Sequence, residues 1–213
     1  MRKIILIFII FLLENVTAHS QSFNDLVKRY REYQRQEKYE EMISICDTML
    51  LKFPDTDAEI TYYNRGNTYR RLREFRQSIE DYTSALKIKP GYISAYLNRA
   101  VSYYDIGEYG NSLADYNKVI DAKPSNSAAY CGRGNIYSML NDNPNAIDNY
   151  SIAIKLDTKN AEAYFNRGNR YYFINLYKSA LEDWEKAIKL RPEYEPELKE
   201  KMNEARFQLD KNK

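Results

Sequence analysis

The sequence contains very few of the side chains on which most enzyme chemistry depends. Among its 213 residues there is one histidine, His19, and there are two cysteines, Cys46 and Cys131. A single histidine excludes sites built from several imidazoles, and its position near the N-terminus places it far from the rest of the chain's polar motifs. We therefore expect no catalytic residues, no metal site and no cofactor.

An excess of charge of one sign is also missing. The chain has 32 basic and 30 acidic residues, which gives a formal net charge of +2. A global basic field that would attract nucleic acid is absent. We therefore expect no nucleic-acid partner.

Long apolar runs are absent except at the N-terminus. Residues Ile4 to Leu13 form an apolar run that follows two cations and precedes Ala18-His19-Ser20. The run is about half as long as the roughly 20 residues that a spanning helix needs, and this three-part pattern is typical of a secretory signal peptide. We predict that residues 1–20 are a signal peptide cleaved near Ser20, which removes His19 and sends a mature chain without a membrane span to the periplasm or cell surface. A retained membrane anchor is the alternative.

From Glu59 to Pro192 the sequence repeats itself with a period of 34 residues. Each repeat has a first phrase rich in Tyr, Asn, Arg and Gly and a second phrase at a constant distance from it. The first phrases are YYNRGNTY (62–69), YLNRAVSY (96–103), YCGRGNIY (130–137) and YFNRGNRY (164–171), and the second are SIEDYTSAL, SLADYNKVI, AIDNYSIAI and ALEDWEKAI. A period in this range indicates a solenoid of stacked two-helix units.

The unit resembles the tetratricopeptide repeat. In the first full unit the matching residues are Tyr62, Arg65-Gly66, Tyr69, Ser78, Tyr82, Ala85 and Pro90. Four such units cover 59–192, and residues 23–54 fit as a weaker, degenerate first unit. The resemblance implies an all-α fold, a right-handed α-solenoid of antiparallel helix pairs, with about eleven helices over 23–209 and no β-strand. Residues 193–213 are expected to form a C-terminal capping helix and tail, because an open-ended solenoid needs a polar cap.

Each unit can be numbered so that its closing residue, a proline in every unit except that of Thr158, is position 32. Positions 4, 8 and 11 of the first helix are then expected to face positions 20, 24 and 27 of the second. Position 8 is small in the four full units, where it is Gly66, Ala100, Gly134 and Gly168, and is Tyr30 in the first unit. Small residues there would let the two helices approach closely. In the slightly longer connection after Pro54, Asp57 is expected to cap the following helix.

Position 7 carries an arginine where the family has an apolar residue. The four arginines are Arg65, Arg99, Arg133 and Arg167, and position 23 of the same units is Asp81, Asp115, Asn149 and Asp183. Our hypothesis is that each arginine lays its stem along the helix pair and offers its guanidinium to position 23, which would relieve the cost of a partly buried charge. The alternative is a row of arginines that binds phosphate or carboxylate groups.

The two cysteines fall in different units and are not expected to form a disulfide. Cys46 and Cys131 lie three units apart, whereas a disulfide needs Cα atoms within about 7 Å. Cys46 occupies a core position and is expected to be a buried small hydrophobe. Cys131 falls on the inner face, where a reactive thiol is the alternative to a packing role.

In the family that the sequence resembles, the first helices line the concave surface. At two groove-facing positions asparagine recurs, as Asn64, Asn98 and Asn166 at position 6 and Asn67, Asn135 and Asn169 at position 9. Asparagine is a poor helix former, and its carboxamide can pair with the main chain of an extended peptide. The pattern is similar to the asparagine ladder in the tetratricopeptide domain of O-GlcNAc transferase. The alternative is that these side chains bond to the adjacent unit and bind nothing.

Aromatic and basic residues flank the asparagines on groove-facing positions. The aromatic candidates for anchoring a partner are Tyr63, Tyr104, Phe165 and Tyr172, and the basic candidates in the first two units are Arg31, Arg35, Arg70 and Arg71. The sequence therefore predicts a non-catalytic scaffold that holds an extended segment of another protein, acidic at one end, within a cell-envelope complex. A glycan-binding module that uses Tyr63, Tyr104 and Tyr172 as stacking platforms is the alternative.

Overall fold

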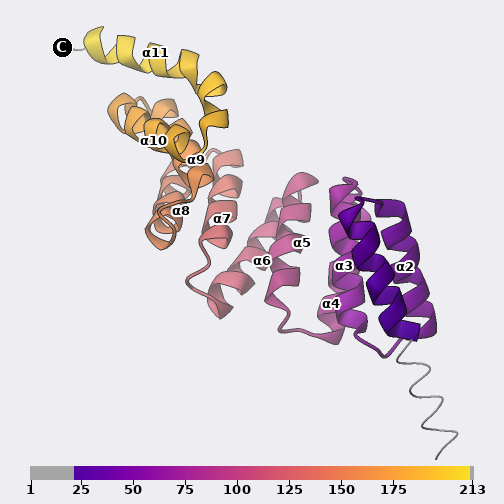
Figure 1. Cartoon of the computed structure of the whole chain (residues 1–213). Helices are drawn as coiled ribbons and strands as arrows, with labels where there is room; N and C mark the ends of the chain where they lie inside the picture. Colours follow the sequence, from indigo (N-terminus) through magenta and orange to yellow (C-terminus); the bar gives the residue numbers. More distant parts are fainter. Residues whose placement is uncertain (1–21, 212–213) are drawn as a thin grey trace, which may run out of the picture. The chain divides into compact units, whose positions relative to one another are not determined.

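A computed structural model of the protein describes residues 22–211 (Figure 1). The predicted signal peptide, residues 1–20, lies outside these residues. The described part forms eleven α-helices and one 3₁₀ turn and contains no β-strand, as the repeat pattern predicts. None of these helices is long and apolar enough to cross a bilayer.

The helices follow one another in pairs along the chain. Residues 22–35 are helical and precede α2. The other elements are α2 (Tyr39–Lys52), α3 (Ala58–Arg71), α4 (Phe75–Ile88), α5 (Ile93–Asp105), α6 (Tyr109–Ala122), α7 (Ser127–Met139), α8 (Asn143–Leu156), α9 (Ala161–Phe173), α10 (Tyr177–Leu190), the 3₁₀ turn η1 (Pro192–Tyr194) and α11 (Glu195–Lys211).

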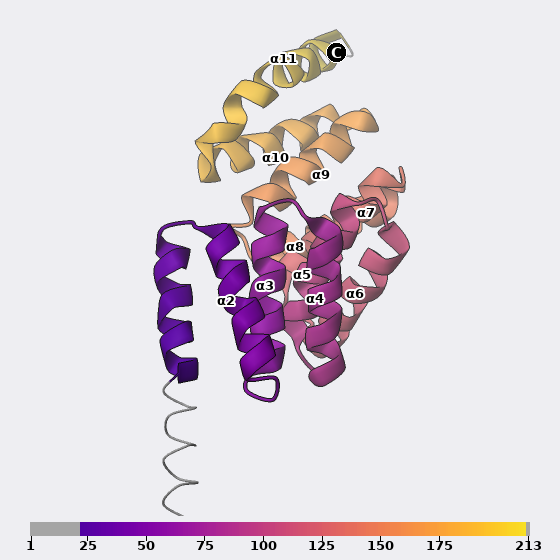
Figure 2. The ribbon, with the colours of Figure 1, turned by 90° about the vertical axis from the view of Figure 1, so that its right-hand side faces the viewer.

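The chain divides into two compact units, residues 1–95 and 96–213. In the first unit, the helical residues 22–35 and α2 share a core and α3 packs against α2 and α4, which Figure 2 shows as adjacent ribbons. In the second unit, α7 pairs with α8 and α9 with α10, while α6 contacts α7 and α8 contacts α9. Each unit is thus a stack in which neighbouring helices bury their apolar sides against one another.

The turn inside each pair has the same backbone geometry. Its central residue, at position 15, has a positive φ of 54° to 78° and is Glu37, Arg73, Gly107, Asn141 or Asn175. The next residue donates its N–H to a tyrosine carbonyl five residues back, at 2.8 to 3.0 Å, as Glu74 does to Tyr69. This is the left-handed helix ending that satisfies the last free carbonyl groups. It reverses the chain within a few residues and so keeps the period constant.

Small residues at position 8 face large aromatic rings at position 24, as the sequence predicts. A Cβ atom added at Gly66 would lie 2.9 Å from the Tyr82 ring, and one added at Gly168 would lie 2.6 Å from the Trp184 ring. Such distances are shorter than van der Waals contact, so these two repeats need glycine at position 8, whereas the α5–α6 repeat has Ala100 there. In the first unit the sizes are exchanged, because Tyr30 at position 8 shares a core with Cys46 at position 24.

The helix α11 packs against α10 at the C-terminal end. Its buried residues are Leu198, Met202 and Ala205, which share a cluster with Ala180 and Trp184 of α10.

The connection between α2 and α3 is slightly longer than those between the later repeats. Asp57 directly precedes α3, and it has a left-handed backbone. Asp57 is therefore the N-cap residue of α3 as expected, but the side-chain hydrogen bond of a cap is not formed. Its carbonyl oxygen instead accepts the N–H groups of Ile60 and Thr61.

Candidate functional site

The arginines at position 7 pair with position 23, which confirms the structural hypothesis. Arg167 of α9 donates from Nε and Nη2 to Asp183 of α10 at 2.7 and 2.8 Å. The two other aspartates make the same twofold contact, Asp81 with Arg65 at 2.8 and 2.6 Å and Asp115 with Arg99 at 2.7 and 2.8 Å. Where position 23 is asparagine, Arg133 Nε donates to Asn149 Oδ1 at 2.8 Å.

Each of these arginines also lies over tyrosine rings. The guanidinium carbon of Arg99 is 5.5 Å from the Tyr96 ring centre and 5.6 Å from that of Tyr103. The aromatic residues at positions 4 and 11 therefore shield the cation, in addition to their packing role. Arg65 and Arg167 have the same pair of ring contacts, and Arg133 lies 5.3 Å from the Tyr130 ring.

Burial and pairing act against each other on the ionisation of these groups. Burial lowers the pKa of Arg167 while its hydrogen bonds to Asp183 raise it, and the net direction is upward. Burial raises the pKa of Asp183 more than Arg167 lowers it. We treat the pair as ionised at neutral pH, because two short charge-assisted hydrogen bonds favour the charged form of both partners.

Position-7 arginines also bond to position 25 of the preceding repeat. Arg133 Nη1 donates to Asn117 at 2.8 Å, Arg167 Nη1 donates to Ser151 at 2.9 Å, and Arg65 pairs with Asp47. The position-7 arginines thus connect the helices within and between repeats. Their donors are directed at the protein, and the alternative of an arginine row for phosphate binding does not fit this geometry.

The asparagines at positions 6 and 9 are half-buried and bond to neighbouring side chains. Asn67 accepts a hydrogen bond from the Tyr82 hydroxyl at 2.8 Å, and Asn135 accepts one from Tyr150 at 2.8 Å. Asn135 also accepts from Asn166 Nδ2 of the next repeat at 2.9 Å and donates to Glu162 at 3.1 Å. Asn135, at position 9, therefore accepts hydrogen bonds from the tyrosine at position 24 of its own repeat and from the asparagine at position 6 of the following repeat.

The last repeat lacks this link between positions 24 and 9. Position 24 is Trp184, whose Nε1 has no hydrogen-bond partner among the described residues, and the same is true of Asn169 Oδ1. The tryptophan fills the space next to Gly168 but cannot extend a hydroxyl to the asparagine. Asn169 consequently keeps an acceptor that no protein group of residues 22–211 satisfies.

The repeat of α5 and α6 also lacks the hydrogen bond between positions 24 and 9, for a different reason. A pocket lies beside this repeat. Position 9 is Val101 in place of asparagine, and position 6 of the next repeat is Gly132 in place of asparagine. A Cβ atom added at Gly132 would lie 2.3 Å from the Tyr116 hydroxyl oxygen. Tyr116 is only 4% exposed, and no described residue forms a hydrogen bond with its hydroxyl. Burial raises the pKa of this hydroxyl.

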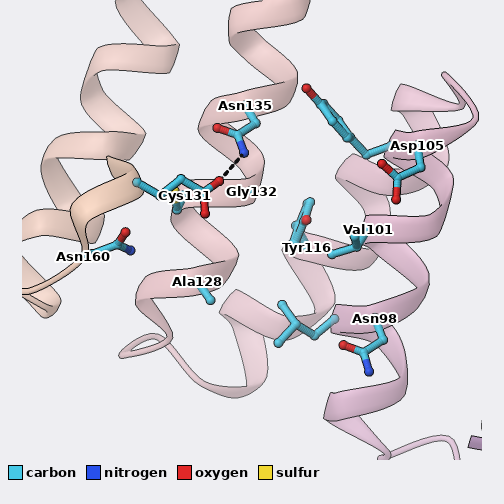
Figure 3. Close-up of a pocket in the computed structure, with 12 residues that line it drawn as sticks. Asn98, Val101, Asp105, Tyr116, Ala128, Cys131, Gly132, Asn135 and Asn160 are labelled. Carbon is cyan, nitrogen blue, oxygen red and sulfur yellow. Dashed lines mark hydrogen bonds between the residues drawn. The ribbon is translucent and has the colours of Figure 1, made fainter. Parts of the chain in front are cut away.

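The pocket has a volume of about 390 Å³ and opens between α5 and α7 (Figure 3). Its lining combines apolar groups and Tyr116 with amide and carboxylate groups. The residues that line it are Leu97, Asn98, Val101, Tyr104, Asp105, Tyr116, Ala128, Cys131, Gly132, Asn135, Asn160 and Glu162. Predicted groove residues Asn98, Asn135 and Tyr104 are thereby brought together, with Asp105 and Glu162 beside them.

Cys131 lies in the wall of this pocket but is 4% exposed. Burial, and secondarily the charge of Glu162, raises the pKa of its thiol. Cys46 is buried in the first unit, where burial raises its pKa to about 12. Both are free thiols in the described structure. Raised pKa values and burial make neither cysteine a reactive nucleophile.

The aromatic groove candidates each contact another ring. Tyr63 lies 4.8 Å from Tyr92, Tyr104 lies 5.7 Å from Tyr109, and Phe165 lies 4.5 Å from Tyr194, measured between ring centres. Tyr172 lies 5.4 Å from Trp184 in the same way. Each ring is therefore held in place by a neighbour and remains half-buried.

The basic candidates lie in the first unit. Arg31 lines a second pocket of about 320 Å³, together with the acidic Asp57, polar side chains and apolar side chains. Arg31, Arg35 and Arg71 are exposed, whereas Arg70 is half-buried. Arg35 pairs with Glu32 at 3.1 Å within its own helix, so part of the expected basic charge is locally neutralised.

The described residues contain no cluster of three or more His, Cys, Asp or Glu side chains that could hold a metal ion. The pocket between α5 and α7 was not identified from the sequence. The sequence does contain a sign of it, since Val101 and Gly132 are the two places in the four full repeats where positions 9 and 6 are not asparagine. Their meaning depends on the direction of the Tyr116 hydroxyl, which only the packing of α6 against α7 determines.

Comparison with known families identifies the class of protein. Tetratricopeptide repeat models match residues 60–92 and 161–194, and a TPR repeat model matches residues 102–141 and 134–174. These matches cover more than half of the chain. The chain therefore belongs to the tetratricopeptide repeat family, whose members are protein-protein interaction scaffolds and generally non-catalytic.

Solved structures show the same fold. A tetratricopeptide repeat protein from Parabacteroides merdae has a TM-score of 0.76 and 22% identity, with alignment over 90% of this chain and 75% of its own. MamA from Desulfovibrio magneticus RS-1 has a TM-score of 0.72 and 18% identity, over 80% and 96%. YrrB, described as a TPR protein with an unusual peptide-binding site, has a TM-score of 0.65 and 18% identity, over 83% and 90%. No curated protein matches the sequence.

Proposed function

We propose that this protein is a scaffold that binds an extended segment of a partner protein on the face formed by the first helices of its repeats. The observation that carries this proposal is the pocket of about 390 Å³ between α5 and α7. Its lining combines apolar groups with amide groups, which is the mixture that recognises a peptide: the apolar groups take a side chain and the amides pair with main chain. The peptide-binding site named for YrrB is consistent with such a use of this fold.

The asparagines contribute to this face in two different ways. Asn135 makes hydrogen bonds to Tyr150, Asn166 and Glu162, so it mainly fixes the positions of its neighbours. Asn169 has an Oδ1 atom without a partner in the described part of the chain. We infer that Asn169 is the stronger candidate for accepting a main-chain N–H group of a bound segment, since a buried acceptor without a partner is costly.

The first unit supplies a second contact region of different charge. Its pocket of about 320 Å³ includes Arg31, and Arg70 and Arg71 lie in the last turn of the helix α3. A partner segment that carries acidic residues or a terminal carboxylate is complementary to these groups. The N-terminal pattern of residues 1–20 supports export, so we place this interaction in the periplasm or at the cell surface, within a cell-envelope complex.

Site-specific photo-crosslinking in the cells of origin tests the proposal. A photoreactive residue at Leu97, on α5 in the pocket wall, is expected to capture a discrete partner, and peptide mapping is expected to locate the crosslink in one continuous segment. The matched control is the same residue at Lys118, which is exposed on α6. Capture of the same partner only from Lys118 would contradict the proposal, because contact would then be made by the second helices.

The same crosslinking experiment distinguishes peptide binding from the alternative of glycan binding. A glycan ligand would stack on Tyr63, Tyr104 and Tyr172 and would leave no crosslinked peptide at Leu97. Binding that survives loss of the pocket but fails when these three rings are changed to alanine would favour the glycan.

A further inference from the structure

The pocket between α5 and α7 contains the Tyr116 hydroxyl, which forms no hydrogen bond with the described residues, and this distinguishes the pocket from the repeats of Tyr82 and Tyr150. In the repeats that contain Tyr82 and Tyr150, the hydroxyl donates to an asparagine at 2.8 Å. In this repeat the asparagine is replaced by Val101, and the Tyr116 hydroxyl lies instead against Gly132. The hydroxyl is directed into the pocket, where a ligand group can reach it (Figure 3).

The charge around the pocket is of one sign. Asp105 and Glu162 line it and are exposed, and no arginine or lysine is among the lining residues. Burial is the main reason that the pKa of the Tyr116 hydroxyl is raised, and Cys131, Glu162 and Asp105 raise it further. A cationic group that enters the pocket therefore meets two carboxylates and no other cation among the residues that line it.

The remaining lining is apolar. It includes Leu97, Val101, Ala128, Gly132 and the buried Cys131. The half-buried Tyr104 ring is also among the lining residues, and an aromatic ring is a group that attracts a cation. An occupant thus needs an apolar stem, a polar end that can donate to a hydroxyl oxygen, and a positive charge.

We propose that this pocket binds a lysine or arginine side chain of the partner protein, with the aliphatic stem between Leu97 and Val101 and the cationic end between Tyr116 and the two carboxylates. Long basic side chains combine an apolar stem with a charged head, which is the combination that the lining requires. The inference rests on the proposed function, since it names the side chain by which a bound segment is anchored. It gives the 96–211 unit a preference opposite in charge to that of the basic residues in the first unit.

The test uses short Ala-Ser peptides that differ only in one central residue, which is lysine, arginine, norleucine or glutamate. Binding to the purified protein is followed by NMR of the methyl groups of Leu97, Val101 and Ala128, which detects weak complexes. The lysine and arginine peptides are expected to bind at least about tenfold more tightly than the norleucine peptide, and the glutamate peptide is expected to bind more weakly still. Equal binding of lysine and norleucine peptides would overturn the proposal, and so would the absence of methyl shifts with every peptide.

Two variants separate the contribution of the cavity and its hydroxyl from that of the two carboxylates. Val101→Asn restores the residue found at position 9 of neighbouring repeats and is expected to bond the Tyr116 hydroxyl, fill the pocket and abolish the preference for lysine. Glu162→Gln with Asp105→Asn is expected to reduce lysine binding to the level of norleucine while leaving the apolar contacts intact. Tyr82→Phe, which removes a hydroxyl in the first unit, is the control and is expected to leave lysine binding unchanged. Unchanged lysine binding in Val101→Asn would contradict the proposal.

The outcomes also distinguish this inference from the proposed function. If all four peptides shift the same methyl groups equally, the face still binds main chain and only the cationic anchor is wrong. If no peptide binds but Leu97 still captures a partner segment in cells, the scaffold function holds and the pocket is not its recognition site.

Discussion

Arg167 and Asp183 lie on the two helices of one repeat and meet through parallel hydrogen bonds of 2.7 and 2.8 Å. Their side chains are 18% and 7% exposed. The guanidinium is enclosed further by Tyr164 and Tyr171, with ring centres 5.9 and 5.6 Å away. The pair is therefore a partly buried ion pair whose two members depend on each other.

Asp183→Ala is expected to lower the free energy of unfolding by about 3 kcal/mol, because it leaves the arginine cation partly buried without its counter-charge. Asp183→Asn is expected to cost less, since Arg133 and Asn149 already form this contact in another repeat at 2.8 Å. Urea denaturation of the two variants measures both losses. A smaller loss for alanine than for asparagine would show that the pair does not stabilise the helix contact.

A second prediction concerns the close approach of the helices. Gly168→Ala is expected to destabilise the protein by about 1 to 3 kcal/mol, because the new Cβ would lie 2.6 Å from the buried Trp184 ring. Leucine at Gly134 or Gly168 is expected to cost at least as much. The matched control is Gly110→Ala in α6, where no atom lies within 4 Å of the added Cβ.

The control substitution is expected to change stability in the opposite direction. Alanine is favoured over glycine in a helix by up to about 1 kcal/mol, so Gly110→Ala should raise the thermal midpoint while Gly168→Ala lowers it. Equal shifts in the two variants would mean that position 8 is not the contact between the helices.

The third prediction compares two tyrosines at the same position of successive repeats. Tyr150→Phe removes a hydrogen bond to Asn135 and is expected to cost about 1 kcal/mol at neutral pH. Tyr116→Phe removes a hydroxyl without a partner in the described structure and is expected to cost much less. Denaturant unfolding at pH 7 measures the difference, and an equal loss would contradict the assignment of the free hydroxyl.

The same two variants should differ from the unmodified protein in alkaline solution. Burial raises the pKa of both hydroxyls above the ordinary value of 10.0. The folded state then keeps protons that the unfolded state loses, so the stabilisation is complete below pH 10 and is lost as pH rises beyond it. Stability is expected to fall above about pH 10, and each phenylalanine variant is expected to show a shallower fall. A rise in stability over that range would contradict the burial of these groups.

The last prediction concerns the partner that crosslinking identifies. Reversing the charge of the half-buried Arg70 and the exposed Arg71 to glutamate is expected to lower affinity and to weaken its dependence on salt, because salt screens charges that solvent reaches. Asn98→Ala with Asn166→Ala is expected to lower affinity at every ionic strength while the helices remain, since alanine is the better helix former. Titrations at low and high salt measure both effects. Equal affinities for all three proteins would indicate that the partner uses the second helices.

The repeat pattern was sufficient to predict the helix pairs, the contact of position 8 with position 24, and the pairing of Arg65 with Asp81. These features follow from periodic side chains that face one another in every repeat. The pocket depends instead on two substitutions in consecutive repeats, Val101 and Gly132, whose joint effect appears only when the Tyr116 hydroxyl is placed. Local backbone geometry was also beyond the pattern, as the left-handed Asp57 shows.

The contacts from position 7 to the preceding repeat have a consequence for how the array can change. Arg167 holds Asp183 within its repeat and Ser151 in the one before, and Arg133 likewise reaches Asn117. Removing a single repeat would place a position-7 arginine against position 25 of a different repeat. Fraying of one helix pair would leave the arginine of the following repeat without its acceptor at position 25. In residues 96–211 such linkage favours melting of adjacent repeats together, because the energy of each interface is shared by both sides. Insertion or loss of repeats in a lineage would then be tolerated mainly where position 25 of the new neighbour is polar.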